Sequence, residues 1–110
     1  MDFEAPPKPL VSTRADDPEV EERIEAFVVG LGETVDALQD AQSGEDWELL
    51  AQRAGTLAAK ARELGYPPVA AAADRVLTAA STRDPEAAHK AVIEVTELAG
   101  RVRRGHRSAA

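Results

Sequence analysis

The sequence predicts an all-α protein, an antiparallel four-helix bundle. Apolar residues recur every three or four positions in four separate segments, the spacing that places them on one face of an α-helix. Proline, glycine and aspartate separate these segments, and no stretch alternates apolar and polar residues as a half-buried strand would. Four amphipathic helices with short connections bury their apolar faces by packing side by side in alternating directions.

The first predicted helix begins at Asp17. The aspartate suits the N-cap, and Pro18 suits the first helical position because its missing N–H would have no partner there. Gly30 and Gly32 each weaken the helix by about 1 kcal/mol relative to alanine and would permit a kink, and Gly44 ends it. The apolar stripe of this helix comprises Val20, Ile24, Phe27, Val28, Leu31, Val35 and Leu38.

The second predicted helix runs from about Glu45 to Leu64. Gly65 and the two prolines after Tyr66 stop it. Its stripe comprises Trp47, Leu50, Ala54, Leu57, Ala61 and Leu64. We expect Trp47, the only tryptophan, to report on the core: its replacement by alanine should cost about 3–5 kcal/mol if it is fully buried, and less than about 1 kcal/mol if it lies at the rim.

The third predicted helix opens at Pro68, and the fourth opens at Asp84-Pro85, which repeats the cap followed by a proline. The inward residues of the third are Val69, Ala72, Ala73, Val76, Leu77 and Ala80. Those of the fourth are drawn from Ala88, Val92, Val95, Leu98, Ala99 and Val102. Arginines near the end of the fourth helix favour its negative pole, and we expect the helix to end at Arg104.

One domain is expected in a chain of 110 residues. The bundle should span residues 10–104, after a flexible proline-rich arm over residues 1–9 and before a flexible tail over residues 105–110.

The composition excludes several classes of function. A net charge of −7 is unsuited to a nucleic-acid partner, which needs a basic surface. No apolar run reaches the roughly 20 residues that span a membrane, and the N-terminal residues lack the pattern of a secretory signal. The absence of cysteine removes disulfides and thiolate metal sites. We therefore expect a cytoplasmic monomer without a membrane partner.

Few residues offer catalytic chemistry. His89 and His106 are the only histidines, and neither has the spacing of a metal site, so we expect no metal, no cofactor and no enzymatic activity. The many carboxylates are typical of a solvated helix face. Gly55 is unusual, because a helical wheel places it outward, where glycine costs about 1 kcal/mol against alanine and adds nothing to the core. It is interpreted as drift, as a close contact with another backbone, or as the remnant of a site.

The sequence Ala54-Gly55-Thr56-Leu57-Ala58-Ala59-Lys60-Ala61-Arg62-Glu63-Leu64-Gly65-Tyr66-Pro67 resembles the second bundle helix of histidine-phosphotransfer (HPt) domains of bacterial phosphorelays. That family has the motif A-H-x-L-K-G-x-x-G-x-x-G, followed by an aromatic residue and a proline. The flanking stretches DDPEVEERIEAFVVGL, GEDWELLAQRA and AAADRVLTAA resemble the neighbouring parts of the same domains, so the likeness covers about residues 9–104. The resemblance implies an HPt-like four-helix bundle.

The chain departs from the family at the functional positions. Gly55 stands at the position of the phosphoacceptor histidine, and Ala58 at that of the lysine that neutralises the phosphoryl group. Ala59 and Arg62 replace two small glycines. Glycine has no nucleophilic nitrogen, so phosphorylation at position 55 is chemically impossible.

Three hypotheses follow for the function. The first is a signalling adaptor that binds a response-regulator receiver domain or a histidine kinase without accepting phosphate. Its docking surface would comprise Gln52, Gly55, Ala58, Ala59 and Arg62. The second is active phosphotransfer through another histidine such as His89, and the third is a helical interaction module with an unrelated partner.

Overall fold

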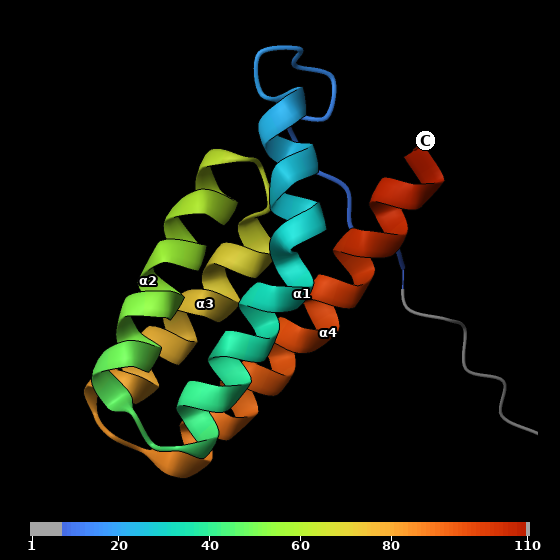
Figure 1. Ribbon diagram of the computed structural model, residues 1–110. Helices are drawn as coiled ribbons and strands as arrows, with labels where there is room; N and C mark the ends of the chain where they lie inside the picture. The colour runs from blue at the N-terminus through green and yellow to red at the C-terminus, as the bar shows by residue number, and fades with distance from the viewer. Residues whose placement is uncertain (1–7, 110) are drawn as a thin grey trace, which may run out of the picture.

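The computed structural model describes residues 8–109, which form four α-helices (Figure 1). These are α1 (Glu21–Ser43), α2 (Trp47–Glu63), α3 (Pro67–Ser81) and α4 (Pro85–Ala109). Successive helices run in opposite directions and pack in a ring, in which α1 contacts α2 and α4, and α3 contacts α2 and α4. The predicted all-α fold, an antiparallel four-helix bundle, is confirmed.

Aspartates cap two of the helices: Asp84 does so as predicted, and Asp46 caps the second helix, which begins at Trp47 and not at the predicted Glu45. The side chain of Asp46 accepts a hydrogen bond from the Leu49 N–H (3.2 Å), and that of Asp84 accepts one from the Ala87 N–H (3.1 Å). Each bond satisfies an N–H that the first turn of a helix leaves without a partner. The third helix begins at Pro67, one residue before the predicted start.

The start of α1 differs from the prediction, because Asp17 does not cap the helix. Its carboxylate accepts from the Glu19 N–H (3.0 Å) and pairs with Arg14 (2.8 Å), within a turn that precedes α1. The hydrogen bond from Arg14 is the main cause of the lowered pKa of Asp17. Val20 occupies the N-cap of α1 without a side-chain hydrogen bond. Asp17 and Pro18 therefore form a separate turn, and the helix is continuous through both of its glycines.

The core is built from alanine, leucine, valine and isoleucine on the inward faces of all four helices. Its largest fully buried side chains are Leu31, Leu38, Leu50, Val20, Val69, Val76, Val95 and Val102. Phe27, Trp47 and Leu77 were predicted to be buried, but they are only partly buried against this core. Trp47 is the first residue of α2 and lies beside the α1–α2 connection, so it packs at one end of the bundle. Trp47 is therefore not fully buried, so the loss of about 3–5 kcal/mol in stability that full burial would imply for Trp47→Ala is not expected.

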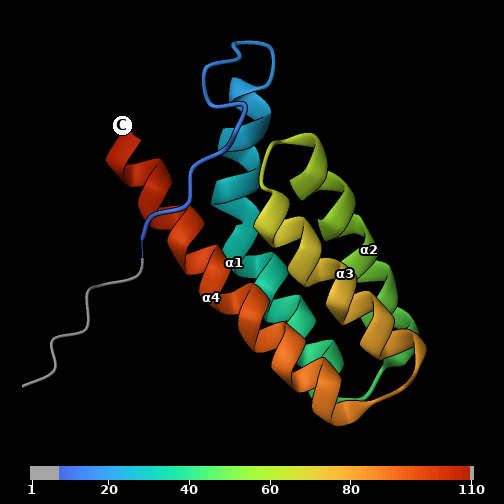
Figure 2. The same cartoon turned by 180° about the vertical axis from the view of Figure 1, so that it is seen from behind.

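The fourth helix continues past Arg104 to Ala109, through most of the predicted tail. Its Gly105 is buried beneath the backbone of Leu10, where the N-terminal segment crosses α4 (Figure 2). The Leu10 N–H donates to the Arg101 carbonyl (2.9 Å), and the Arg101 Nε donates to the Lys8 carbonyl (2.7 Å). Residues 1–7 of the predicted arm, and residue 110 of the predicted tail, lie outside the described residues.

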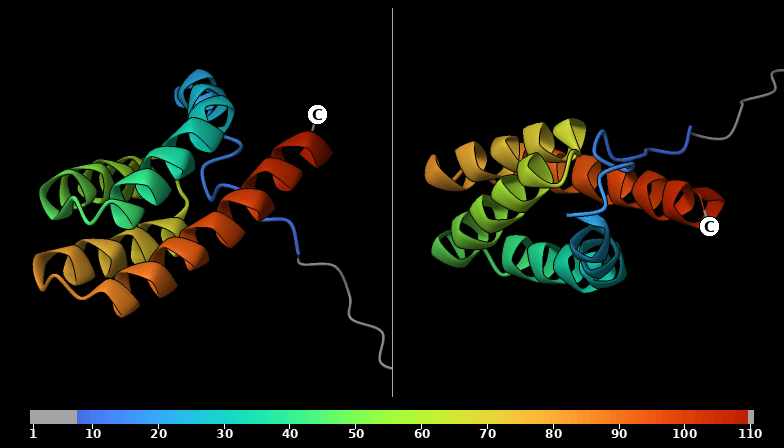
Figure 3. Two further views of the ribbon diagram at one scale, coloured as in Figure 1. Left: turned by 60° about the horizontal axis from the view of Figure 1, so that its bottom comes forward. Right: turned by 90° about the horizontal axis from the view of Figure 1, so that it is seen from above.

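The same N-terminal segment packs against the turn between α2 and α3 (Figure 3). The Thr13 N–H donates to the Gly65 carbonyl (2.8 Å), and the buried Ser12 hydroxyl donates to the Leu64 carbonyl. Gly65 has a positive φ of 83°, as expected for a glycine that ends a helix. Residues 8–14 therefore hold the α2–α3 turn and the C-terminal part of α4 at one end of the bundle.

Candidate functional site

The outer face of α2 carries few side chains around Gly55. Gln52 and Ala59 are exposed on this face, and Gly55 between them is half-buried. A Cβ built on Gly55 would have no heavy atom within 4 Å outside its own helix backbone and chain neighbours, so the space beyond this position is open. We call these three residues, Gln52, Gly55 and Ala59, the α2 strip.

The structure separates the other two predicted docking residues from this strip. Ala58 is only 3% exposed, so the prediction that it contributes to the docking surface is wrong. It lies one turn before Arg62, which pairs with Asp74 of α3, so this flank of α2 faces α3. Arg62 is exposed and pairs with Asp74 of α3 (2.8 Å), so it stands at the edge of the strip.

Replacing Gly55 with alanine is expected to raise the free energy of unfolding by a few tenths to about 1 kcal/mol. Position 55 is helical and the added methyl group meets open space, so alanine adds helix propensity without a clash. Urea denaturation followed by far-UV circular dichroism measures the change. A loss of stability would mean that position 55 needs glycine for close backbone packing, which contradicts the open surface.

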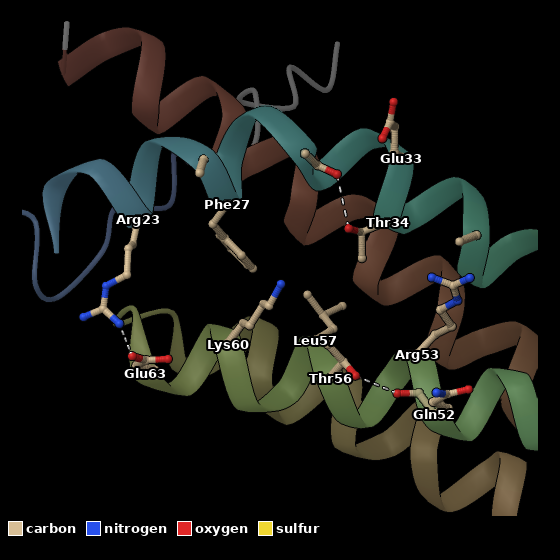
Figure 4. A pocket seen from close by; sticks show the side chains of 13 residues that line it. Arg23, Phe27, Glu33, Thr34, Gln52, Arg53, Thr56, Leu57, Lys60 and Glu63 are labelled. Atoms are coloured by element: carbon tan, nitrogen blue, oxygen red, sulfur yellow. Dashed lines mark hydrogen bonds and ion pairs between the residues drawn. The ribbon is translucent and has the colours of Figure 1, made fainter.

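A groove of about 730 Å³ runs beside the strip, between α1 and α2 (Figure 4). The residues that line it are Arg23, Ala26, Phe27, Gly30, Glu33, Thr34 and Ala37 of α1 and Gln52, Arg53, Thr56, Leu57, Lys60 and Glu63 of α2. Phe27 is half-buried and Leu57 is buried, and together they give the groove an apolar floor. Gln52 belongs both to the groove and to the α2 strip.

The charged side chains of the groove are arranged unevenly. Arg23 and Glu63 form an ion pair at one end. Lys60 lies between Phe27 and Leu57 with its ammonium group toward α1, and Arg53 also reaches toward α1 (Figure 4). Within residues 8–109 neither of these two cations has a carboxylate within 4 Å.

The floor of the groove is continuous with the α2–α3 turn. Phe27 stacks on Tyr66 with ring centroids 5.5 Å apart. Burial raises the pKa of the Tyr66 hydroxyl. This stack fixes Phe27 at the end of the groove that the Arg23–Glu63 pair occupies.

Sequence reasoning missed this groove, although both of its walls have a helical spacing. On α1 the small residues Ala26, Gly30 and Ala37 follow one flank, where Gly30 was considered only as a weak point of the helix. On α2, Arg53 and Lys60 stand two turns apart on the flank next to the core stripe. The sequence therefore contains the small residues and the cations that line the groove, but it does not reveal how far apart α1 and α2 lie.

Both histidines are on α4, which does not pack against α2, the helix that carries the strip. His89 is exposed on α4, with its Nδ1 3.4 Å from the Oε1 of Gln42 near the end of α1. His106, at the other end of α4, borders a second hollow of about 340 Å³ together with Glu21, Glu25 and other residues.

The chain matches no protein-family model, no curated protein and no solved structure. The likeness to HPt domains therefore rests on the residues of the chain itself. Within residues 8–109, no group of three or more His, Cys, Asp or Glu side chains is placed to hold a metal ion. No helix in that range is long and apolar enough to cross a membrane.

Proposed function

We propose that this protein is an HPt-like adaptor of a bacterial two-component phosphorelay, which binds a receiver domain or a histidine kinase without accepting phosphate. One observation carries the proposal. Gly55, at the position of the phosphoacceptor in the family it resembles, lies on an open face of α2 with an exposed alanine one turn away. The surface at this position is therefore accessible to a partner, although it carries no nucleophile.

The chemistry of the position supports binding without transfer. Phosphotransfer needs a nucleophilic nitrogen, and glycine offers no side-chain atom. The lysine that would balance the charge of the phosphoryl group is replaced by Ala58, which is buried. A lysine restored at position 58 would have to extend its stem past α3 to bring its ammonium group to the surface.

The α2 strip suits close contact with a folded partner. Gly55 and Ala59 let the partner's loops approach the helix backbone, and Gln52 and Arg62 provide a polar rim. We expect a small surface of this kind to bind with a Kd on the order of micromolar, which corresponds to a binding free energy of about −8 kcal/mol. In the alternative hypothesis the protein accepts phosphate on another histidine. His89 is exposed, so it is the candidate acceptor that an experiment must test.

The experiment has two parts. The intact protein is first incubated with acetyl phosphate and with a phosphorylated receiver domain, and acid-labile phosphate is measured on wild type and on His89→Gln. We expect no label on either. Label that wild type carries and His89→Gln lacks would replace this proposal by phosphotransfer through His89.

Receiver domains captured from a native lysate are then purified and titrated calorimetrically. Ala59→Glu should weaken binding at least about tenfold, because its carboxylate would stand in the contact. The matched control is Val29→Glu, which adds the same charge at a residue that is 76% exposed on α1. Equal affinity of wild type and Ala59→Glu would mean that the α2 strip is not the docking surface.

A further inference from the structure

The groove between α1 and α2 concentrates positive charge in an acidic protein. The chain has a net charge of −7, yet Arg53 and Lys60 both reach into this groove. The groove has two acidic residues: Glu63 is neutralised by Arg23, and Glu33 points away from the groove (Figure 4). Two cations without an ion-pair partner among the described residues therefore face an apolar floor.

The dimensions of the groove match a short helix. Its lining spans residues 23–37 of α1 and 52–63 of α2, which at 1.5 Å per residue correspond to about 21 Å and about 17 Å. That length accommodates about three turns of a third helix. Arg53 and Lys60 are seven residues apart, so they lie on one flank of α2 at an axial separation of about 10 Å.

Gly30 leaves room for close approach on the α1 wall. A Cβ built there would meet no heavy atom within 4 Å outside its own helix backbone and chain neighbours, so the wall has open space in front of its backbone. The buried Leu57 and the half-buried Phe27 form the floor beneath it. An apolar stripe of a partner helix would cover this floor and exclude water from it.

We propose that this groove binds an acidic amphipathic helix of a partner protein. Leucine-type side chains of that helix would lie over Phe27 and Leu57, and two carboxylates two turns apart would pair with Arg53 and Lys60. In the free protein the aliphatic stem of Lys60 lies over the floor, and on binding it would move aside to meet a carboxylate. The groove is a second binding surface and does not depend on the receiver-docking role of the α2 strip.

The test uses the full chain and a designed probe. The probe is a fluorescein-labelled helical peptide of about three to four turns, with leucines at i, i+3, i+4 and i+7 and glutamates on both flanks of the leucine stripe. Its matched control peptide replaces every glutamate with lysine. We expect fluorescence anisotropy to give a Kd on the order of 10–100 µM for the acidic peptide only, and added salt to weaken that binding.

Variants of the protein locate the binding. The double variant Arg53→Glu/Lys60→Glu should weaken binding at least about tenfold, and Lys90→Glu, an exposed lysine on α4, should leave it unchanged. Gly30→Leu should also abolish binding, because its side chain fills the groove without changing charge. Thermal melts monitored by circular dichroism verify that each variant is folded, and the single variant Lys60→Glu replaces the double variant if that does not fold.

Amide chemical shifts separate this surface from the α2 strip. On titration with the acidic peptide, the ¹⁵N–¹H signals of Gly30 and Lys60 should move more than that of Gly55. The proposal is overturned if wild type binds neither peptide, if it binds the basic peptide equally well, or if the largest shifts occur at Gly55 and Ala59. It is also overturned if sedimentation shows self-association that Gly30→Leu removes, since the occupant would then be a second copy of the chain.

Discussion

Replacing Gly65 with alanine is expected to lower the free energy of unfolding by about 2–5 kcal/mol. The residue has a φ of 83°, a conformation in which a Cβ costs about 1–2 kcal/mol. The Cβ would also lie 2.6 Å from the Thr13 Oγ1 and 2.9 Å from the Arg14 backbone nitrogen. Relief of this overlap requires the N-terminal segment to shift, and overpacking of this kind costs about 1–3 kcal/mol.

Urea denaturation measures this loss, and Gly44→Ala is its control. Gly44 also follows a helix, but its φ is −83° and its nearest Cβ contact would be an ordinary one, 3.4 Å from the Asp40 carbonyl oxygen. The control should therefore change stability by no more than about 0.5 kcal/mol. A loss below about 1 kcal/mol for Gly65→Ala would show that residues 12–14 do not pack on the turn as described.

The four helices were predictable because their signals are local. The inward residues of α2, such as Leu50 and Leu57, recur at the helical period, and Gly65 ends the helix by its own conformation. The start of α1 was missed because an aspartate before a proline caps an isolated turn as readily as a helix. Asp17 joins Arg14 in such a turn, and only the position of that turn relative to the bundle distinguishes the two cases.

The candidate site was less predictable because it depends on how the helices pack. A helical wheel orients Gly55 and Ala59 correctly toward solvent, since that direction is opposite the core stripe. Ala58 lies on a flank, and whether a flank is covered depends on the neighbouring helix, which here is α3. The groove beside Lys60 was missed for the same reason, because it depends on the spacing between α1 and α2 and not on the pattern of either helix alone.

The role of Gly105 could not be inferred from the sequence. At the end of an arginine-rich helix a glycine is typical of a stop signal, and the predicted tail begins at this residue. In the fold its missing side chain lets the backbone of Leu10, remote in sequence, cross the helix at close range. Such a contact leaves no local periodicity from which it could be inferred.

Replacing Gly105 with alanine is therefore expected to destabilise the protein by about 1–3 kcal/mol, although alanine is the better helix former. The new Cβ would overlap the carbonyl oxygen of Leu10 and lie 3.0 Å from its carbonyl carbon, so the segment would move and weaken the Leu10–Arg101 hydrogen bond. Gly100→Ala is the matched control in the same helix. Its Cβ would have no neighbour within 4 Å, and it should stabilise by up to about 1 kcal/mol.

Both substitutions gain helix propensity. The difference in stability between the two variants therefore reports mainly the contact of residue 105 with Leu10. Chemical denaturation of both variants should therefore give a difference of about 1–4 kcal/mol between them. Amide hydrogen exchange at Leu10 and Thr13 should also accelerate in Gly105→Ala and stay unchanged in Gly100→Ala, because both amides donate hydrogen bonds that hold the segment. Equal stability of the two variants would mean that the segment does not press on Gly105, and that residues 8–14 leave the end of α4 uncovered in solution.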